Sequence, residues 1–82
     1  MADKAIIMFC ANGNQRVDLE VPLNITAVEL IQALNSAYSL GVAQDKLGES
    51  YLKCENPIAL LRGNKTLGEM GIHNGSKISF EK

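Results

Sequence analysis

Residues 16–21 read Arg-Val-Asp-Leu-Glu-Val, an unbroken alternation of polar and apolar side chains. Because successive side chains of a strand point to opposite faces, this pattern predicts a strand with one buried face. The preceding residues 5–11 are rich in strand formers, and Asn12-Gly13-Asn14 between the two segments is a turn signal. We therefore predict a β-hairpin that ends at Pro22, which has no N–H to donate to a ladder.

A helix is predicted to follow the hairpin. Thr26 and Glu29 form a capping box, in which the Thr26 hydroxyl accepts from the Glu29 N–H and the carboxylate reaches back. The apolar residues that follow recur at helical spacing and predict a helix of about 14 residues with one buried side. They are Ala27, Leu30, Ile31, Leu34 and Tyr38. Gly41 is expected to supply the left-handed residue that ends the helix.

The second half of the chain alternates short strands with turns. We predict a polar loop over 42–50, strands over Tyr51–Glu55, Ile58–Leu61 and Lys77–Phe80, turns at Asn56-Pro57 and Asn74-Gly75, and a single helical turn over 66–72. The resulting order ββαβββ predicts an α+β fold with one helix packed on a sheet. A length of 82 residues admits one domain, 1–82.

Composition excludes several classes of protein. Hydrophobic residues make up 46% and charged residues 21% of the chain, which is typical of a globular domain and not of a disordered one. The net charge of −1 argues against nucleic-acid binding, and no apolar run is long enough to insert into a membrane. Cys10 and Cys54 lie far apart without CxxC spacing, so we expect free thiols in a reducing compartment.

No residue pattern predicts an enzyme, a cofactor site or a metal site. His73 is the only histidine and is expected at a solvated turn, where it lacks the partner and pocket that a catalytic base needs. Cys10 ends an apolar strand and lacks the cationic neighbours of a reactive thiol. Residues 62–65 read Arg-Gly-Asn-Lys but lack the spacing of a phosphate-binding loop, so a solvated turn is expected.

The element order and several segments resemble the ubiquitin-like β-grasp fold over nearly the whole chain. They are Val17–Val21, the capped helix from Thr26, and Thr66-Leu67-Gly68-Glu69-Met70-Gly71-Ile72. Within that superfamily, residues 71–78 (Gly-Ile-His-Asn-Gly-Ser-Lys-Ile) resemble the Gly-Ile-x-Asn-Gly-Asp-x-Leu segment of the YukD/EsaB proteins. Those proteins are encoded with bacterial type VII (WXG-type) secretion systems. The resemblance therefore implies a mixed sheet and a cytoplasmic role in secretion.

The end of the sequence differs from that of conjugated ubiquitin-like proteins and sulfur carriers. Those proteins end in a Gly-Gly tail that is activated at its carboxylate. Here the last residues are Ser79-Phe80-Glu81-Lys82, without a Gly-Gly tail. The YukD/EsaB proteins also lack this tail. We therefore expect no covalent conjugation.

The first strand is predicted to carry a binding face. Alternation places Ala5, Ile7 and Phe9 inward and leaves Ile6 and Met8 pointing outward. Because the β-grasp fold places this strand centrally, Ile6 and Met8 are expected to form an exposed apolar centre with a polar rim, the anatomy of a protein interface. The rim is expected to include Tyr51, Lys53 and Glu81, together with Asp18, Glu20, Lys77 and Ser79. The alternative is that two scattered apolar side chains have no function.

The leading functional hypothesis is a non-enzymatic interaction module. The resemblance implies an accessory or regulatory protein that docks on a cytosolic domain of the type VII membrane machinery. One alternative is a covalently attached modifier or carrier. Another is a ubiquitin-like domain that binds a GTPase through its edge strand, although Asp18 and Glu20 supply no basic residues there.

Overall fold

The computed structural model describes residues 4–11, 16–55 and 58–80 of the chain. The elements in chain order are β1 (Lys4–Ala11), β2 (Val17–Pro22), α1 (Ala27–Tyr38), the 3₁₀ helix η1 (Gln44–Glu49), β3 (Leu52–Glu55), β4 (Ile58–Leu61) and β5 (Lys77–Phe80). The predicted turns at Asn12-Gly13-Asn14 and Asn56-Pro57 lie outside the described residues.

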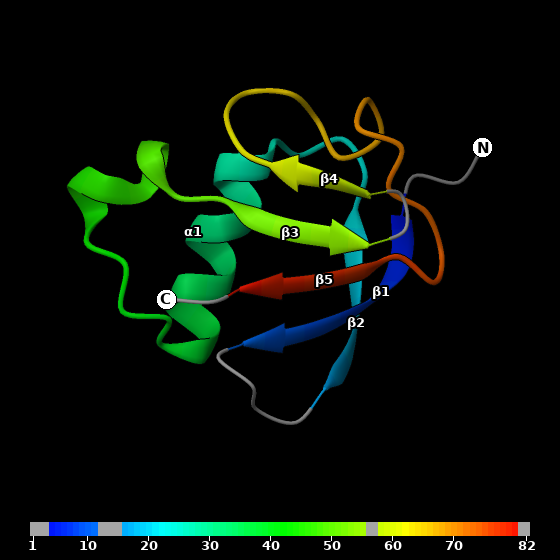
Figure 1. Cartoon of the computed structure of the whole chain (residues 1–82), viewed down its shortest axis with the longest axis horizontal. Coiled ribbons are helices and arrows are strands. Elements are labelled where there is room, and N and C mark those ends of the chain that lie inside the picture. Colours follow the sequence, from blue (N-terminus) through cyan, green and yellow to red (C-terminus); the bar gives the residue numbers. More distant parts are fainter. Residues whose placement is uncertain (1–3, 12–15, 56–57, 81–82) are drawn as a thin grey trace.

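The strands form one five-stranded mixed sheet in the order β2-β1-β5-β3-β4 (Figure 1). The β1–β5 pair is parallel, and the β1–β2, β3–β4 and β3–β5 pairs are antiparallel. Because α1 carries the chain across the sheet, the last strand lies beside the first. The predicted α+β, ubiquitin-like β-grasp fold is confirmed.

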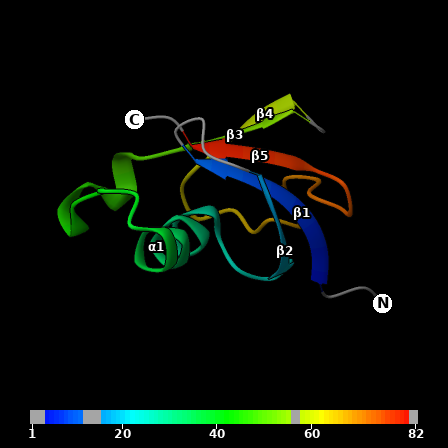
Figure 2. The ribbon, with the colours of Figure 1, turned by 90° about the horizontal axis from the view of Figure 1, so that it is seen from below.

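Helix α1 packs on one face of the sheet (Figure 2). The inward positions of β1 are almost completely buried, as alternation predicted: Ala5, Ile7 and Phe9. The core between helix and sheet includes Leu30, Ile31 and Leu34 of α1 and Ile78 and Phe80 of β5, while Leu19 is partly buried against it. The helix therefore covers one face of the sheet and leaves the opposite face as the candidate binding surface.

The capping box at the start of α1 forms as predicted. The Glu29 N–H donates to Thr26 Oγ1 at 3.2 Å, and the Thr26 N–H donates to Glu29 Oε1 at 2.9 Å. The backbone and hydroxyl hydrogen bonds from Thr26 hold the pKa of the Glu29 carboxyl below its ordinary value. The box therefore satisfies one of the helix's free N–H groups and stabilises the charged form of its own carboxylate.

The turn over residues 62–65 supplies the next two partners for α1. The Ala27 N–H donates to the Lys65 carbonyl oxygen at 3.0 Å, and the Val28 N–H donates to the Gly63 carbonyl oxygen at 3.1 Å. We predicted only a solvated turn here. The prediction missed that this turn accepts hydrogen bonds from the start of α1. The carbonyl groups of the turn complete the capping of a helix that lies more than thirty residues earlier in the sequence.

Helix α1 ends earlier than predicted. It covers 12 residues, and the left-handed residue at its end is Ser39, with φ 54°, in place of Gly41. Gly41 also has positive φ, at 80°, but it lies beyond the cap. The Asn35 side chain donates to the Val42 carbonyl oxygen at 2.8 Å and accepts from the Val42 N–H at 3.0 Å. The helix therefore ends at Ser39, two residues before Gly41, and these two bonds tie the chain back to the helix just after Gly41.

Residues 42–50 are not the simple polar loop that we predicted. They include η1, which carries Leu47 into the core, and Leu40 before it is also buried. The Lys46 N–H donates to the Ala43 carbonyl oxygen at 2.9 Å, which starts the 3₁₀ turn. Leu47 is isolated among polar residues and glycine and has no apolar periodicity, so sequence patterning alone could not identify this anchor.

Residues 71–78, which carried the family resemblance, attach the chain to β1. The Ile6 N–H donates to Asn74 Oδ1 at 2.8 Å, and the Gly75 N–H donates to the Ile6 carbonyl oxygen at 2.9 Å. The Met8 N–H then donates to the Ser76 carbonyl oxygen at 2.9 Å. These contacts set the parallel register of β5 against β1, so the motif has a structural role.

Candidate protein-binding face

The face of the sheet opposite α1 is covered by none of the described elements (Figure 2). Strand register shows which side chains share a row on this outer face. Cys10 lies beside Ser79, Ser79 lies beside Lys53, and Lys53 lies beside Leu60. This row crosses from β1, the second strand of the sheet, to the edge strand β4.

A second row runs parallel to the first. Met8 lies opposite Asp18 on β2 and beside Lys77 on β5. Extending the β3–β5 register by two residues places Glu55 beside Lys77, and Glu55 lies opposite Ile58 on β4. The outer face therefore has apolar side chains on β1 and β4 and charges of both signs between them.

The candidate residues of β1 point outward, as predicted. Ile6 is 52% exposed, and Met8 is half-buried. Lys53 is exposed on β3, while Glu81 lies outside the described residues. Met8 and Lys77 line a shallow hollow of about 280 Å³ on this face. The apolar centre of the proposed interface is thus accessible, with one side chain prominent and one recessed.

The structure does not bring all of the candidates together. Tyr51 is 43% exposed and precedes β3, two residues before Lys53. Ile6 lies two residues before Met8, toward the other end of the sheet. The strand registers separate the Ile6 and Tyr51 levels by six residues, about 20 Å at the usual rise. The two residues therefore mark opposite ends of the face.

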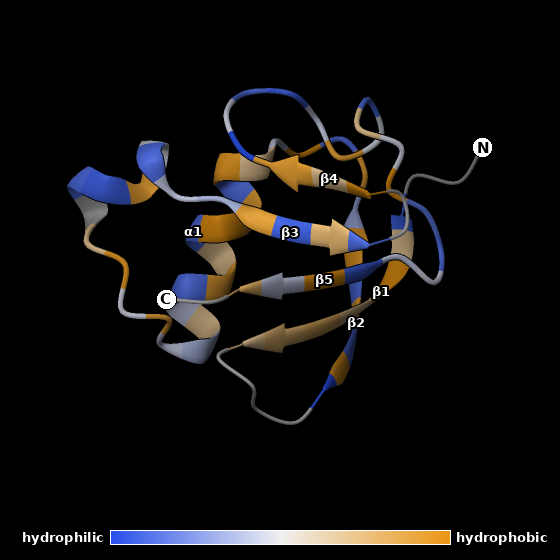
Figure 3. Ribbon diagram, viewed as in Figure 1, coloured by the Kyte–Doolittle hydropathy of each residue, from blue (hydrophilic) through white to orange (hydrophobic). Residues whose placement is uncertain are grey.

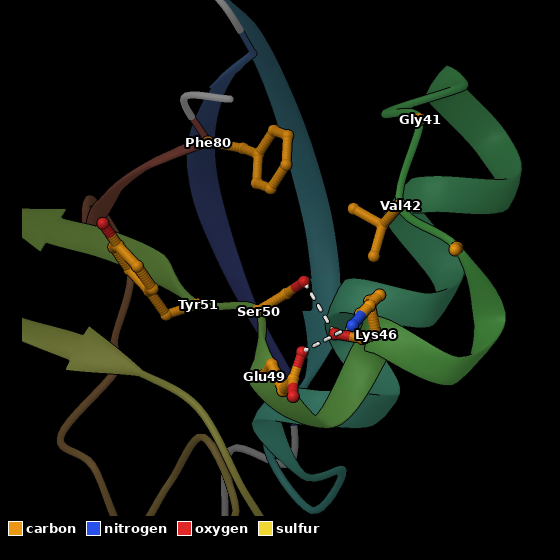
Figure 4. Close-up of a pocket in the computed structure, with 8 residues that line it drawn as sticks. Gly41, Val42, Lys46, Glu49, Ser50, Tyr51 and Phe80 are labelled. Carbon is orange, nitrogen blue, oxygen red and sulfur yellow. Dashed lines mark hydrogen bonds and ion pairs between the residues drawn. The ribbon is translucent and has the colours of Figure 1, made fainter.

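Tyr51 belongs to a separate hollow of about 400 Å³ between η1 and the end of the sheet (Figure 4). Phe80 and Val42 contribute apolar walls. Polar groups near it are already engaged, since Ser50 Oγ donates to the Lys46 carbonyl oxygen at 3.0 Å and Lys46 Nζ lies 3.6 Å from Glu49. The residues that line this hollow therefore do not form a set of reactive groups that point toward one another.

The sequence analysis missed the two most exposed aliphatic side chains of the outer face. Ile58 is 92% exposed and Leu60 is 57% exposed on β4. Together with Lys53 and Glu55 they line a hollow of about 560 Å³. The ribbon of β4 is largely in the hydrophobic colours (Figure 3). The Ile-Ala-Leu-Leu segment is wholly apolar and shows no alternation. Only the pairing of β4 with β3 shows that Ile58 and Leu60 share the outer face, while Leu61 is buried.

The histidine and cysteine side chains of the described residues do not form a catalytic or metal-binding cluster. His73 is exposed at a turn, and its Nδ1 lies 2.8 Å from the carbonyl oxygen of Asn74. Among residues 4–11, 16–55 and 58–80, no three His, Cys, Asp or Glu side chains gather as a metal site requires. Cys10 is half-buried, and Cys54 is buried in the core.

Comparison with known families gives a clear assignment. The family model described as "WXG100 protein secretion system (Wss), protein YukD" matches residues 6–79. The chain belongs to the YukD family. This confirms the resemblance that residues 71–78 predicted and associates the protein with type VII secretion. No curated protein matches the chain.

Solved structures confirm the ubiquitin-like fold of this YukD-family protein. Caldiarchaeum subterraneum ubiquitin is 18% identical, with a TM-score of 0.72 over 96% of this chain and 92% of that one. The C-terminal ubiquitin-like domain of mouse tubulin-specific chaperone e is 14% identical, with a TM-score of 0.73 over 96% and 86%. The ubiquitin-like domain of Plasmodium falciparum Dsk2 is 13% identical, with a TM-score of 0.59 over 93% and 96%. At these identities the likeness concerns the fold alone.

In the described part of the chain, no helix has the length and apolar character needed to cross a membrane.

Proposed function

We propose that this protein is a non-enzymatic, non-conjugated accessory or regulatory module of a type VII secretion system. Its outer sheet face docks on a cytosolic domain of the membrane machinery, and Ile6 and Met8 form the centre of the contact. Lys53 and Tyr51 extend the contact toward the other end of the face, with Glu81 proposed in the same rim.

The uncovered outer face is the observation that supports this proposal. Helix α1 already occupies the opposite face, so the outer face is the larger surface left to a partner (Figure 2). Ile6 is half exposed on this face, and its backbone is held by Asn74 and Gly75. An exposed apolar side chain on a hydrogen-bonded backbone, with charged neighbours, fits the core-and-rim anatomy of a protein interface.

The test is the double change Ile6→Ser with Met8→Ser. Interface anchors commonly contribute about 2 kcal/mol or more, so partner binding should weaken by roughly 30-fold or more. The measurements are co-purification with the cytosolic domains of the machinery and secretion of the WXG-type substrate. The matched control is Gln32→Ser with Ala33→Ser, which alters two exposed positions of α1 and should leave both readouts unchanged.

Circular dichroism should show that both double variants are folded, because neither pair belongs to the core. A folded Ile6/Met8 variant with full binding and secretion would show that this centre is idle and would direct attention to Tyr51 and its hollow. The intact mass of the protein recovered with its partner should equal that of the free chain. An added covalent mass would place the protein in the modifier or carrier class.

A further inference from the structure

The two edges of the sheet have very different chemistry. Edge strand β2 reads Val-Asp-Leu-Glu-Val-Pro, so Asp18, Glu20 and Pro22 are present to discourage pairing with another strand. Edge strand β4 reads Ile-Ala-Leu-Leu and has no charge and no proline. Strand β4 therefore lacks the protection, other than shortness, that proteins give to a free edge.

The backbone of β4 is also available. Among the described residues, β3 is its only ladder partner, and no other backbone hydrogen bond involves Ile58–Leu61. After Leu61 the chain turns toward the helix, where the carbonyl oxygens of Gly63 and Lys65 accept from α1. Alternate N–H and C=O groups of β4 therefore point away from the sheet, as in any edge strand.

We propose that two copies of this chain associate through antiparallel pairing of β4 with β4, which joins the two sheets into one. In the pairing that the side chains favour, the two-fold axis passes beside Ala59. Ile58 then lies opposite Leu60 of the partner subunit, and Leu60 lies opposite Ile58 of the partner subunit. The proposal is independent of the docking site proposed above.

The side-chain pattern favours a second copy as the occupant and favours this register, because Ile58 and Leu60 then each gain an apolar neighbour. The flanking charges lie about 14 Å apart across three strand spacings and contribute little. Glu55 lies beside Ile58 and Lys53 lies beside Leu60 on β3. Read across the paired sheet, one row runs from Glu55 to Ile58, then to Leu60 of the partner subunit and Lys53 of the partner subunit. Each row therefore has two apolar side chains between opposite charges. A second copy brings this complementary arrangement automatically, whereas an unrelated strand would have to match it.

A shift of the register by two residues removes this complementarity. Leu60 would then lie opposite Leu60 of the partner subunit, with Lys53 on both sides of the pair. Ile58 would lie opposite Arg62 of the partner subunit, and its apolar surface would gain no apolar neighbour. Pairing of Ile58 with itself is also disfavoured, because each Leu60 would then have no apolar neighbour on the partner subunit.

The contact is small. Four residues from each chain cover far less than the roughly 1,600 Å² of a standard stable interface. We therefore expect a reversible dimer that depends on protein concentration, with a dissociation constant below about 1 mM. Such a weak association suits a protein that changes partners, since pairing responds to local concentration.

The experiment is sedimentation equilibrium of the full chain up to about 1 mM, the concentration that corresponds to the weakest affinity considered. The unmodified protein should show dimer, and Leu60→Asp should weaken it at least tenfold. Ile6→Asp is the matched control, because Ile6 has similar exposure on the same face but lies on β1. It should dimerise like the unmodified protein.

A mixture of Leu60→Asp with Ile58→Lys tests the register. Each variant alone should be mainly monomeric. In the mixed dimer the new carboxylate lies opposite the new ammonium group, and the other row keeps Ile58 opposite Leu60 of the partner subunit, so the heterodimer should recover.

Three results would overturn the proposal: a monomeric unmodified protein at about 1 mM, equal weakening by Ile6→Asp, or no recovery in the mixture. Circular dichroism checks that each variant is folded. If Leu60→Asp does not fold, Ile58→Lys alone decides the question, since Ile58 is almost fully exposed.

Discussion

Two segments of the chain begin with the same local signal and end differently. Thr26 and Glu29 start α1, while Thr66 and Glu69 start a short turn before β5. In each box the glutamate N–H lies 3.2 Å from the threonine hydroxyl, and the hydroxyl lies 3.0 Å from the carboxylate. One box begins a helix of 12 residues, and the other begins a single turn.

The residues that follow each box account for the difference. After Thr66 the chain closes at once, because the Ile72 N–H donates to the Leu67 carbonyl oxygen and the Gly71 N–H donates to the Gly68 carbonyl oxygen, both at 3.1 Å. This is the Schellman arrangement that ends a helix, with Gly71 at φ 83°. No glycine interrupts α1. A capping box therefore starts a helix but does not set its length.

The two segments also support each other in space. Their capping threonines form an isolated antiparallel bridge. The Ala27 N–H donates to the Lys65 carbonyl oxygen at 3.0 Å, and the Leu67 N–H donates to the Ile25 carbonyl oxygen at 2.9 Å. The short turn is thus fixed by the start of the long helix, and this pairing explains how one turn remains ordered without helical length.

The largest effect is expected from Leu67, the apolar residue directly after the capping Thr66 of the second box. Leu67 is fully buried, and Leu34 of α1 is nearly so. Leu67→Ala and Leu34→Ala should each lower the free energy of unfolding by roughly 2–5 kcal/mol, because each leaves a cavity in the same core. Urea unfolding measures both. A cost below about 1 kcal/mol for Leu67→Ala alone would show that the short turn is peripheral, unlike the helix.

Removal of the caps should have an intermediate effect. Thr26→Ala and Thr66→Ala should each cost about 1 kcal/mol, since each leaves a backbone N–H without its hydroxyl acceptor. Thr26→Ser and Thr66→Ser keep the hydroxyl and are the matched controls. If Thr26→Ala lowers the free energy of unfolding and Thr66→Ala leaves it unchanged, the second turn is held by its tertiary contacts alone. The two boxes would then not be equivalent.

Acidification should have the smallest effect. Hydrogen bonds from the threonine backbone and hydroxyl lower the pKa of Glu29 and of Glu69. A lowered folded-state pKa means that each carboxylate stabilises the fold above its unfolded pKa and loses that contribution as the pH falls through its folded pKa. The free energy of unfolding should therefore decrease over this acidic range.

The measurement is urea unfolding at a series of acidic pH values. Glu29→Gln with Glu69→Gln keeps a side chain that can reach back but removes the titration, so the decrease should become shallower. Glu55→Gln lies outside both boxes and is the control. An unchanged pH profile in the double variant would show that the boxes do not contribute to acid sensitivity.

The outer face shows how far sequence patterning can reach. Ile6 and Met8 were placed outward correctly because Ala5, Ile7 and Phe9, which alternate with them, had to be buried. Ile58 and Leu60 were missed because every residue of β4 is apolar. Such a segment has no alternation of polar and apolar residues from which the outward side could be predicted. The separation of Tyr51 from Ile6 was also unpredictable, since it depends on the registers of three strands.

Local patterns in the sequence were enough to predict the order of the main helix and the strands, the hairpin, the start of α1 and the inward side of β1. These follow from local hydrogen bonding and from side-chain periodicity, which act over a few residues. Three features emerged only from the folded arrangement: residues 62–65 cap α1, Leu47 anchors η1, and β4 lies at an unprotected edge. Each of these depends on groups distant in sequence that meet after the sheet has formed, and no local pattern records which groups will meet.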